Sequence, residues 1–171
     1  VQPVAGDKAI YEMERCARAG ARGIGELRPD AQGFSLTDKK AMGDLVEAAR
    51  RLGMAILLHS SEPVGHEYKG KGLVAPEQLY GFVKAFPEAS VVCAHWGGGL
   101  PFYALMPEVA SALQHTYFDT AASPLLYRPE IFRHVTEIIG ADRILFGSDY
   151  PLLSLRRYLT QLRSLNLSAE V

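Results

Sequence analysis

Five ionisable residues stand at or near the ends of five short apolar runs in this chain. They are Glu26, His59, His95, Asp119 and Asp149. Neutral imidazole and carboxylate are the ligands that zinc, manganese and iron prefer in proteins. A bound divalent ion also lowers the pKa of its water to about 7, which provides hydroxide at neutral pH. If these residues meet at one edge of a sheet, the pattern predicts a metal-assisted hydrolytic site.

Each residue also has an ordinary structural explanation. A single histidine after an apolar strand is commonly a hydrogen-bonded structural residue, and an aspartate such as Asp149, with Pro151 after it, can cap the next helix. Glu26 can pair with Arg28, and Asp119 can order a loop. The recurrence of such residues at equivalent positions favours a shared site, because independent structural residues need not fall on one edge.

The elements that would position these residues alternate along the chain. The apolar runs Gly23–Leu27, Met54–His59, Val91–His95, Thr116–Asp119 and Ile144–Asp149 are typical of buried strands. Amphipathic segments between and around them predict helices at about 7–19, after a cap at Thr37, from Pro76, from Pro129 and at about 154–164. The segment 101–113 is ambiguous, because Pro107 would kink or break a helix there.

Strict alternation of strands and helices predicts one α/β domain over residues 1–171 with parallel strands joined by crossover helices. The carboxyl edge of such a sheet is its ligand-binding face, so the ionisable residues would converge there. The pattern alone allows either an open doubly wound sheet or part of a (β/α)8 barrel.

Composition sets further limits. The 171 residues are 48% hydrophobic and 22% charged, as in globular proteins, and the net charge of −1 gives no reason to expect a nucleic acid or a membrane as partner. No apolar run approaches the roughly 20 residues that span a bilayer. Two cysteines, Cys16 and Cys93, and an N-terminal stretch unlike a secretory signal favour a reducing, cytoplasmic setting.

Three segments in order resemble one known family. The segment GADRILFGSDYP, residues 140–151, is similar to the last-strand motif of the amidohydrolase-2 branch of the amidohydrolase superfamily, whose members include aminocarboxymuconate-semialdehyde decarboxylase. VVCAHWGGG, residues 91–99, resembles the sixth-strand motif of that branch, and MAILLHSSEPVG, residues 54–65, resembles the fifth. The resemblance implies a TIM-type (β/α)8 barrel in which this chain supplies about five βα units, strands four to eight.

The resemblance also implies roles for residues. His59 and Asp149 would be ligands of one divalent ion, zinc first and manganese or iron as alternatives. Asp149 would also accept a proton from the attacking water, and His95 would contact that water or the substrate. Glu26, Arg28, His66 and Trp96 would shape or line the site of a small carboxylated or cyclic substrate, on which the intact enzyme acts as a hydrolase or decarboxylase.

The sequence departs from the family in one respect. The His-x-His pair that begins the family's metal site is absent, and His59, His66, His95, His115 and His134 are all isolated. A typical barrel needs about 250 residues. We therefore expect a fragment without strands one to three, in which the metal could be missing, and which needs the other barrel half or a second copy as partner.

Two other interpretations stay open. A catalytically inactive barrel remnant could serve as a binding or assembly module, and an unrelated open α/β domain is the third possibility. The chain contains no GxGxxG, GxxxxGK[ST] or GxSxG motif, which argues against nucleotide binding and serine hydrolysis. The triplet Gly97–Gly99 is a weak nucleotide signal, which close approach of the backbone or a flexible turn would equally explain.

Overall fold

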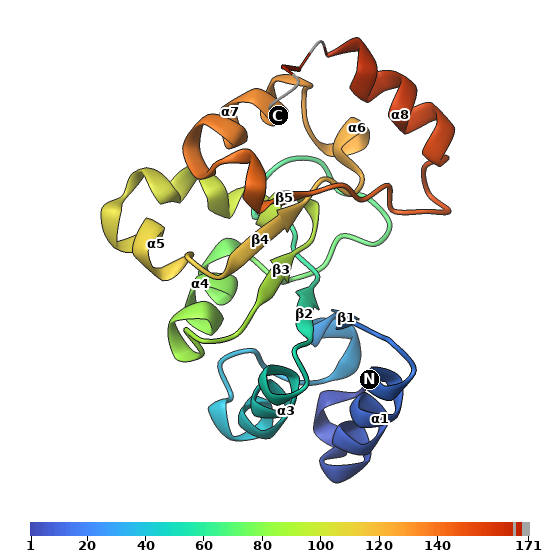
Figure 1. The fold of residues 1–171 in the computed structure, drawn as a ribbon. Coiled ribbons are helices and arrows are strands. Elements are labelled where there is room, and N and C mark those ends of the chain that lie inside the picture. The colour runs from blue at the N-terminus through green and yellow to red at the C-terminus, as the bar shows by residue number, and fades with distance from the viewer. Residues whose placement is uncertain (166, 169–171) are drawn as a thin grey trace.

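A single parallel sheet organises the chain (Figure 1). The computed structural model describes residues 1–165 and 167–168. Within them, the strands are β1 (Gly23–Leu27), β2 (Ala55–Leu58), β3 (Val91–Cys93), β4 (Thr116–Asp119) and β5 (Ile144–Leu145). All five predicted strands are present, although β2, β3 and β5 end earlier than the apolar runs that predicted them.

The order of the strands in the sheet equals their order in the chain, β1-β2-β3-β4-β5, and every neighbouring pair is parallel. A doubly wound sheet reverses its strand order at a switch point, whereas a barrel adds each strand next to the preceding one. The described residues contain no reversal. The fold is therefore part of a (β/α)8 barrel, which decides between the two architectures that the sequence left open.

Helices cover the outside of this sheet and connect its strands (Figure 1). The α-helices are α1 (Asp7–Arg18), α2 (Pro29–Gln32), α3 (Lys39–Arg51), α4 (Pro76–Ala85), α5 (Pro107–Ala112), α6 (Ser123–Leu126), α7 (Glu130–Ile139) and α8 (Leu155–Ser164). Three 3-10 segments are η1 (Pro3–Ala5), η2 (His95–Leu105) and η3 (Ala141–Arg143).

Local sequence explains several of the helix starts. The cap of α3 is Asp38 and not the expected Thr37, because the Asp38 carboxylate accepts hydrogen bonds from the N–H groups of Lys40 and Ala41. Pro107 begins α5 instead of breaking a longer helix, a position where its missing N–H costs nothing. Pro129 stands just before α7 as its N-cap.

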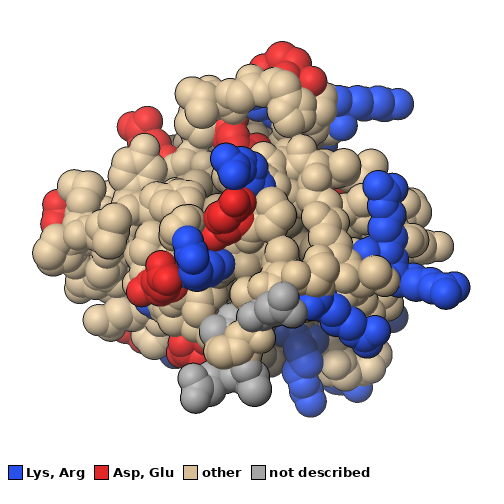
Figure 2. Space-filling model, turned by 90° about the horizontal axis from the view of Figure 1, so that it is seen from above, with Lys and Arg blue, Asp and Glu red and all other residues tan. Residues whose placement is uncertain are grey.

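The core lies between the sheet and its helices. Its largest fully buried side chains come from every part of the fold, and they include Met13 of α1, Phe82 of α4, Phe118 of β4 and Tyr158 of α8. None of the helices in the described part of the chain is long and apolar enough to cross a membrane. Acidic and basic side chains both occur on the face drawn in Figure 2, and some of them lie next to one another.

Candidate metal and active site

The carboxyl edge of the sheet gathers the residues that the sequence singled out. Glu26 lies in β1, His59 follows β2, His95 follows β3 and Asp149 lies four residues after β5. These four residues line one cavity of about 500 Å³. The complete lining is Glu26, Arg28, His59, His66, Tyr68, Lys69, Gly70, His95, Ala122, Leu125, Leu126, Asp149 and Leu152.

Glu26, His59 and His95 form the centre of this site. Oε1 of Glu26 lies 2.7 Å from Nδ1 of His59 and 3.6 Å from Nε2 of His95. The two imidazole rings meet edge to face, with their centroids 5.2 Å apart. One ligand atom from each of the three residues lies within 4.8 Å of the other two. Both histidines are buried, while the Glu26 side chain is 35% exposed toward the cavity.

The charges in this cluster stabilise one another. Burial acts to raise the pKa of Glu26, but hydrogen bonds and charge from His59 and His95 outweigh it and lower the pKa to about 2. Burial acts to lower the pKa of His95, but the hydrogen bond to Glu26, the contact with the Ala121 carbonyl and the nearby carboxylates raise it to about 9. Both shifts favour an ionised Glu26 carboxylate opposite a protonated His95 imidazole.

This donor set fits a divalent metal ion. Two ligands of a tetrahedral zinc ion lie about 3.3 Å apart, given bonds of about 2.0–2.2 Å. The separations of 2.7 Å and 3.6 Å between Glu26 and the two histidines lie on either side of that spacing. One carboxylate and two imidazoles also match the ligand preferences of zinc and manganese. The sequence analysis expected His59 and Asp149 as ligands, and the cluster contains His59 but not Asp149. It also includes Glu26 and His95, while Asp149 lies elsewhere on the cavity wall.

An unusual backbone turn delivers His95. The residues from His95 to Gly99 all have positive φ, between 54° and 96°. A Cβ at Gly97 would stand 2.7 Å from the Phe118 ring, and one at Gly98 would stand 2.5 Å from the Ser61 carbonyl oxygen. Backbone conformation and close approach therefore explain the glycine triplet, and close approach was one of the explanations that the sequence offered.

Asp119 fixes the entry to this turn. Its Oδ1 accepts hydrogen bonds from the N–H groups of His95 and Ala121, both at 2.9 Å. Nδ1 of His95 lies 3.2 Å from the Ala121 carbonyl oxygen, which leaves Nε2 facing Glu26. Burial raises the pKa of Asp119 against these hydrogen bonds. Asp119 thus orders a loop, the structural role that the sequence allowed, and this loop orients His95.

Thr120 performs a similar task for the segment that carries Asp149. Its hydroxyl donates to the Gly147 carbonyl and accepts from the Gly147 N–H, both at 3.1 Å. The Thr120 N–H also donates to the Leu145 carbonyl at 3.0 Å. Asp149, two residues beyond Gly147, has a φ of 60° and lines the cavity. The chain after β5 is therefore held against β4 before it enters the site.

Comparison with known proteins identifies the family of this chain. The model of a family described as "Amidohydrolase" matches residues 1–171, the whole chain. The chain belongs to the amidohydrolase family. The match includes all three motifs that carried the resemblance in the sequence.

Solved structures similar to this amidohydrolase chain include three bacterial decarboxylases. The first is 5-carboxyvanillate decarboxylase from Sphingomonas paucimobilis, with a TM-score of 0.70 and 15% identity over 97% of this chain and 58% of that one. The second is dihydroxybenzoic acid decarboxylase from Polaromonas sp. JS666 with bound manganese and 2-nitroresorcinol, with a TM-score of 0.67 and 16% identity over 94% of this chain and 60% of that one. The third is 5-carboxyvanillate decarboxylase from Novosphingobium aromaticivorans with manganese and 4-hydroxy-3-methoxy-5-nitrobenzoic acid, with a TM-score of 0.69 and 16% identity over 98% of this chain and 57% of that one. At these identities the similarity shows the fold. The present chain spans about 60% of their length.

Trp96 does not lie where the sequence analysis expected it in this amidohydrolase chain. Its side chain is fully buried, packs edge to face against Phe132 of α7, and donates its indole N–H to Ser123. The left-handed turn sends His95 and Trp96 to different sides, so the indole enters the core and is absent from the cavity wall. Arg28 and His66 do line the cavity, and their role in substrate binding stays a prediction.

The sequence analysis missed several lining residues. Tyr68 and Lys69 reach the cavity from the loop between β2 and α4, and Tyr68 donates a hydrogen bond to Glu62 at 3.2 Å. Burial and the Glu62 carboxylate raise the pKa of Tyr68 to about 12. The loop lacks a regular pattern, so composition gave no signal for these residues beyond its position after the His59 strand.

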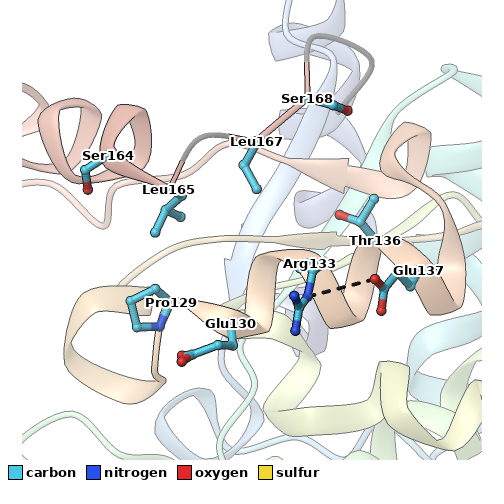
Figure 3. A pocket seen from close by; sticks show the side chains of 9 residues that line it. All are labelled: Pro129, Glu130, Arg133, Thr136, Glu137, Ser164, Leu165, Leu167 and Ser168. Carbon is cyan, nitrogen blue, oxygen red and sulfur yellow. Dashed lines mark ion pairs between the residues drawn. The ribbon is translucent and has the colours of Figure 1, made fainter.

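A second cavity of about 660 Å³ lies on the outside of the fold, between α7 and the segment after α8 (Figure 3). Pro129, Glu130, Arg133, Thr136, Glu137, Ser164, Leu165, Leu167 and Ser168 line it. Arg133 and Glu137 form an ion pair across one turn of α7, with 3.9 Å between Nε and Oε1. These groups satisfy each other on the helix surface, so the Glu26 cavity is the stronger candidate for chemistry.

Proposed function

We propose that this chain carries the metal-binding and catalytic residues of a metal-dependent hydrolase or decarboxylase that acts on a small carboxylated or cyclic compound. The observation that carries the proposal is the cluster of Glu26, His59 and His95, which lines a cavity on the carboxyl edge of the sheet. Membership of the amidohydrolase family and the fold shared with manganese-containing decarboxylases support it.

In this proposal Glu26, His59 and His95 hold one divalent ion, zinc or manganese. The ion supplies a Lewis acid that polarises a substrate oxygen or acidifies water. Asp149, which lines the same cavity, would accept the proton from the attacking group or serve as a further ligand of the ion. His95 stays oriented through Asp119 and Ala121, so its Nε2 faces Glu26 at the proposed position of the ion.

Cationic side chains of the cavity would bind the substrate. Arg28 pairs with both carboxylate oxygens of Asp30, at 3.3 Å and 3.4 Å, and donates to the Lys71 carbonyl at 3.4 Å. In this proposal the guanidinium, held in place by these contacts, also attracts the carboxylate of the substrate. Lys69 and His66 line the same wall, and Leu125, Leu126 and Leu152 provide apolar contact. A planar acid or cyclic ester would satisfy both kinds of surface.

The test is calorimetric titration of the metal-free chain with Mn²⁺ and with Zn²⁺, followed by turnover assays on aromatic acids and cyclic esters. We expect saturable binding of one ion that His59→Asn abolishes. His134→Asn is the matched control, because His134 lies exposed on α7. Equal binding by His59→Asn would contradict the metal site. Tight binding without turnover on any substrate would favour the alternative of an inactive binding or assembly module.

A further inference from the structure

Ser61 makes a contact with His59 that neither the motif nor the family match assigns. It follows His59 by two residues and is buried, with 2% of its surface exposed. Its Oγ lies 3.1 Å from Nε2 of His59, on the side of the ring opposite Glu26. The same oxygen accepts a hydrogen bond from the Gly72 N–H at 2.8 Å. The Ser61 N–H donates to the Val74 carbonyl at 2.9 Å, which fixes the residue from its backbone.

A histidine that binds a metal through one ring nitrogen needs a fixed partner at the other. That partner sets the orientation of the ring and which nitrogen carries the hydrogen. A serine hydroxyl suits this task, because it is both a donor and an acceptor. With one lone pair of Ser61 engaged by Gly72, a hydrogen and a second lone pair remain for His59.

Gly72 brings the far end of the loop onto the same ring. A Cβ at this position would stand 2.8 Å from Cδ2 and 2.9 Å from Nε2 of His59. The φ of Gly72 is outside the left-handed region. Glycine is therefore needed here for close approach to the imidazole and not for a special backbone angle. The His59 ring is held between Glu26, Ser61 and the backbone of residue 72.

We propose that Ser61 is a positioning residue for His59, and that its bond to Gly72 couples the loop of residues 62–73 to the metal site. The inference rests on the proposed function for the meaning of the site, but the contact with the ring does not depend on a metal. Because the same loop carries His66, Tyr68 and Lys69 to the cavity, the order of the substrate wall and the orientation of His59 are linked.

The test compares Ser61→Ala with Ser60→Ala. Ser60 is a matched control, since it is equally buried and its hydroxyl has no hydrogen-bond partner within the described residues. The first readout is the ring-nitrogen NMR signals of His59 in the metal-free chain, identified by their loss in His59→Asn. Ser61→Ala should shift the Nε2 signal, Ser60→Ala should not, and Ser61→Thr, which keeps the hydroxyl, should restore it.

The second readout is the Kd for Mn²⁺ and Zn²⁺. Loss of the hydrogen bond to the second ring nitrogen of a metal-binding histidine weakens metal affinity about 10–100-fold. We therefore expect the Kd to rise by this factor in Ser61→Ala and to stay unchanged in Ser60→Ala. Gly72→Ala, which keeps the Ser61 hydroxyl but crowds the ring, should shift the same signal. An unchanged His59 signal in both Ser61→Ala and Gly72→Ala would overturn the inference. A wild-type chain that binds neither ion would refute the proposed function, while the metal-free signals would still decide the role of Ser61.

Discussion

Nδ1 of His59 lies 2.7 Å from Oε1 of Glu26, although the two residues are 33 positions apart in the chain. The contact follows from the register of the sheet. The register shifts between Ile24 and Leu27, so that Leu27 in β1 stands opposite Leu58 in β2, and both leucines are buried in the core. Because successive side chains of a strand alternate between faces, their chain neighbours Glu26 and His59 share the other face at the carboxyl edge. A parallel pair of strands thus converts two distant sequence positions into neighbours.

The ion pair between Glu26 and His95 should make the free energy of unfolding of the metal-free chain depend on pH. The folded pKa of His95 is raised to about 9, so its contribution is full below the unfolded value of about 6.5 and is lost as the pH rises through 9. The folded pKa of Glu26 is lowered to about 2, so its contribution is present above about 4.5 and is lost as the pH falls toward 2. Chemical unfolding with a chelator present measures this free energy. Its difference between wild type and Glu26→Gln should be largest between about pH 4.5 and 6.5. A constant difference from pH 2 to 10 would contradict the pairing.

Asp149→Asn should reduce kcat about 10²–10⁴-fold in the active, metal-loaded protein, because an amide of similar size cannot accept a proton. The fold should persist, since Asp149 lies on the cavity wall and not in the core. Steady-state kinetics beside circular dichroism would measure both effects. Asp142→Asn, on the exposed 3-10 segment η3, is the control. Wild-type kcat in Asp149→Asn would leave this residue only a structural role.

Thr120→Val should weaken the attachment of the Asp149 segment to β4. The substitution preserves shape but removes the hydroxyl that bonds both polar groups of Gly147. We expect the free energy of unfolding to fall by about 1 kcal/mol, because the half-buried N–H and carbonyl of Gly147 lose their hydrogen-bond partner. Denaturant titration would measure it, with Thr136→Val on α7, whose hydroxyl bonds Phe132 within its own helix, as comparison. If both variants lose the same stability, the Gly147 contacts have no special importance.

Gly98→Ala should destabilise the chain more than a surface glycine substitution does. Residue 98 has a φ of 60°, and its new Cβ would meet the Ser61 carbonyl oxygen at 2.5 Å. A cost of at least about 1 kcal/mol is expected for alanine at an incompatible φ. Gly43→Ala, in α3 with open space around it, should instead stabilise by about 0.5–1 kcal/mol. Thermal unfolding of the two variants would test this opposite sign.

The purified 171-residue chain should associate with itself through the open β5 edge of its sheet. In the described structure β5 pairs only with β4, and Leu145 and Phe146 beside that edge are 42% and 46% exposed. Unpaired strand edges with apolar side chains favour further pairing. Sedimentation velocity should show species larger than 18.7 kDa that Leu145→Lys reduces. Leu105→Lys, at an exposed leucine away from this edge, should not change the distribution. A single monomeric species for wild type would refute the prediction.

The sequence predicted the fold further than it predicted the site. Apolar runs located all five strands, since buried parallel strands need continuous apolar residues whatever their neighbours are. The choice of a barrel required the strand order, which is a long-range property. Glu26, His59, His95 and Asp149 could be placed on one edge because strand ends are local features. Trp96 could not be placed, because the left-handed turn at residues 95–99 decides its direction. Ser61 and Tyr68 lie in a loop without a regular sequence pattern, so their roles could be recognised only from tertiary contacts.

The consecutive strand order also has a consequence for how the chain acquires its structure during synthesis. Each strand pairs with the strand synthesised just before it. We therefore expect that each βα unit can pair with the preceding strand as soon as it leaves the ribosome. Glu26 and His59 would then meet early, His95 would join them once β3 docks, and Asp149 would arrive last. A nascent chain stalled before β5 would already possess the carboxylate and both imidazoles while still lacking the group that completes the cavity.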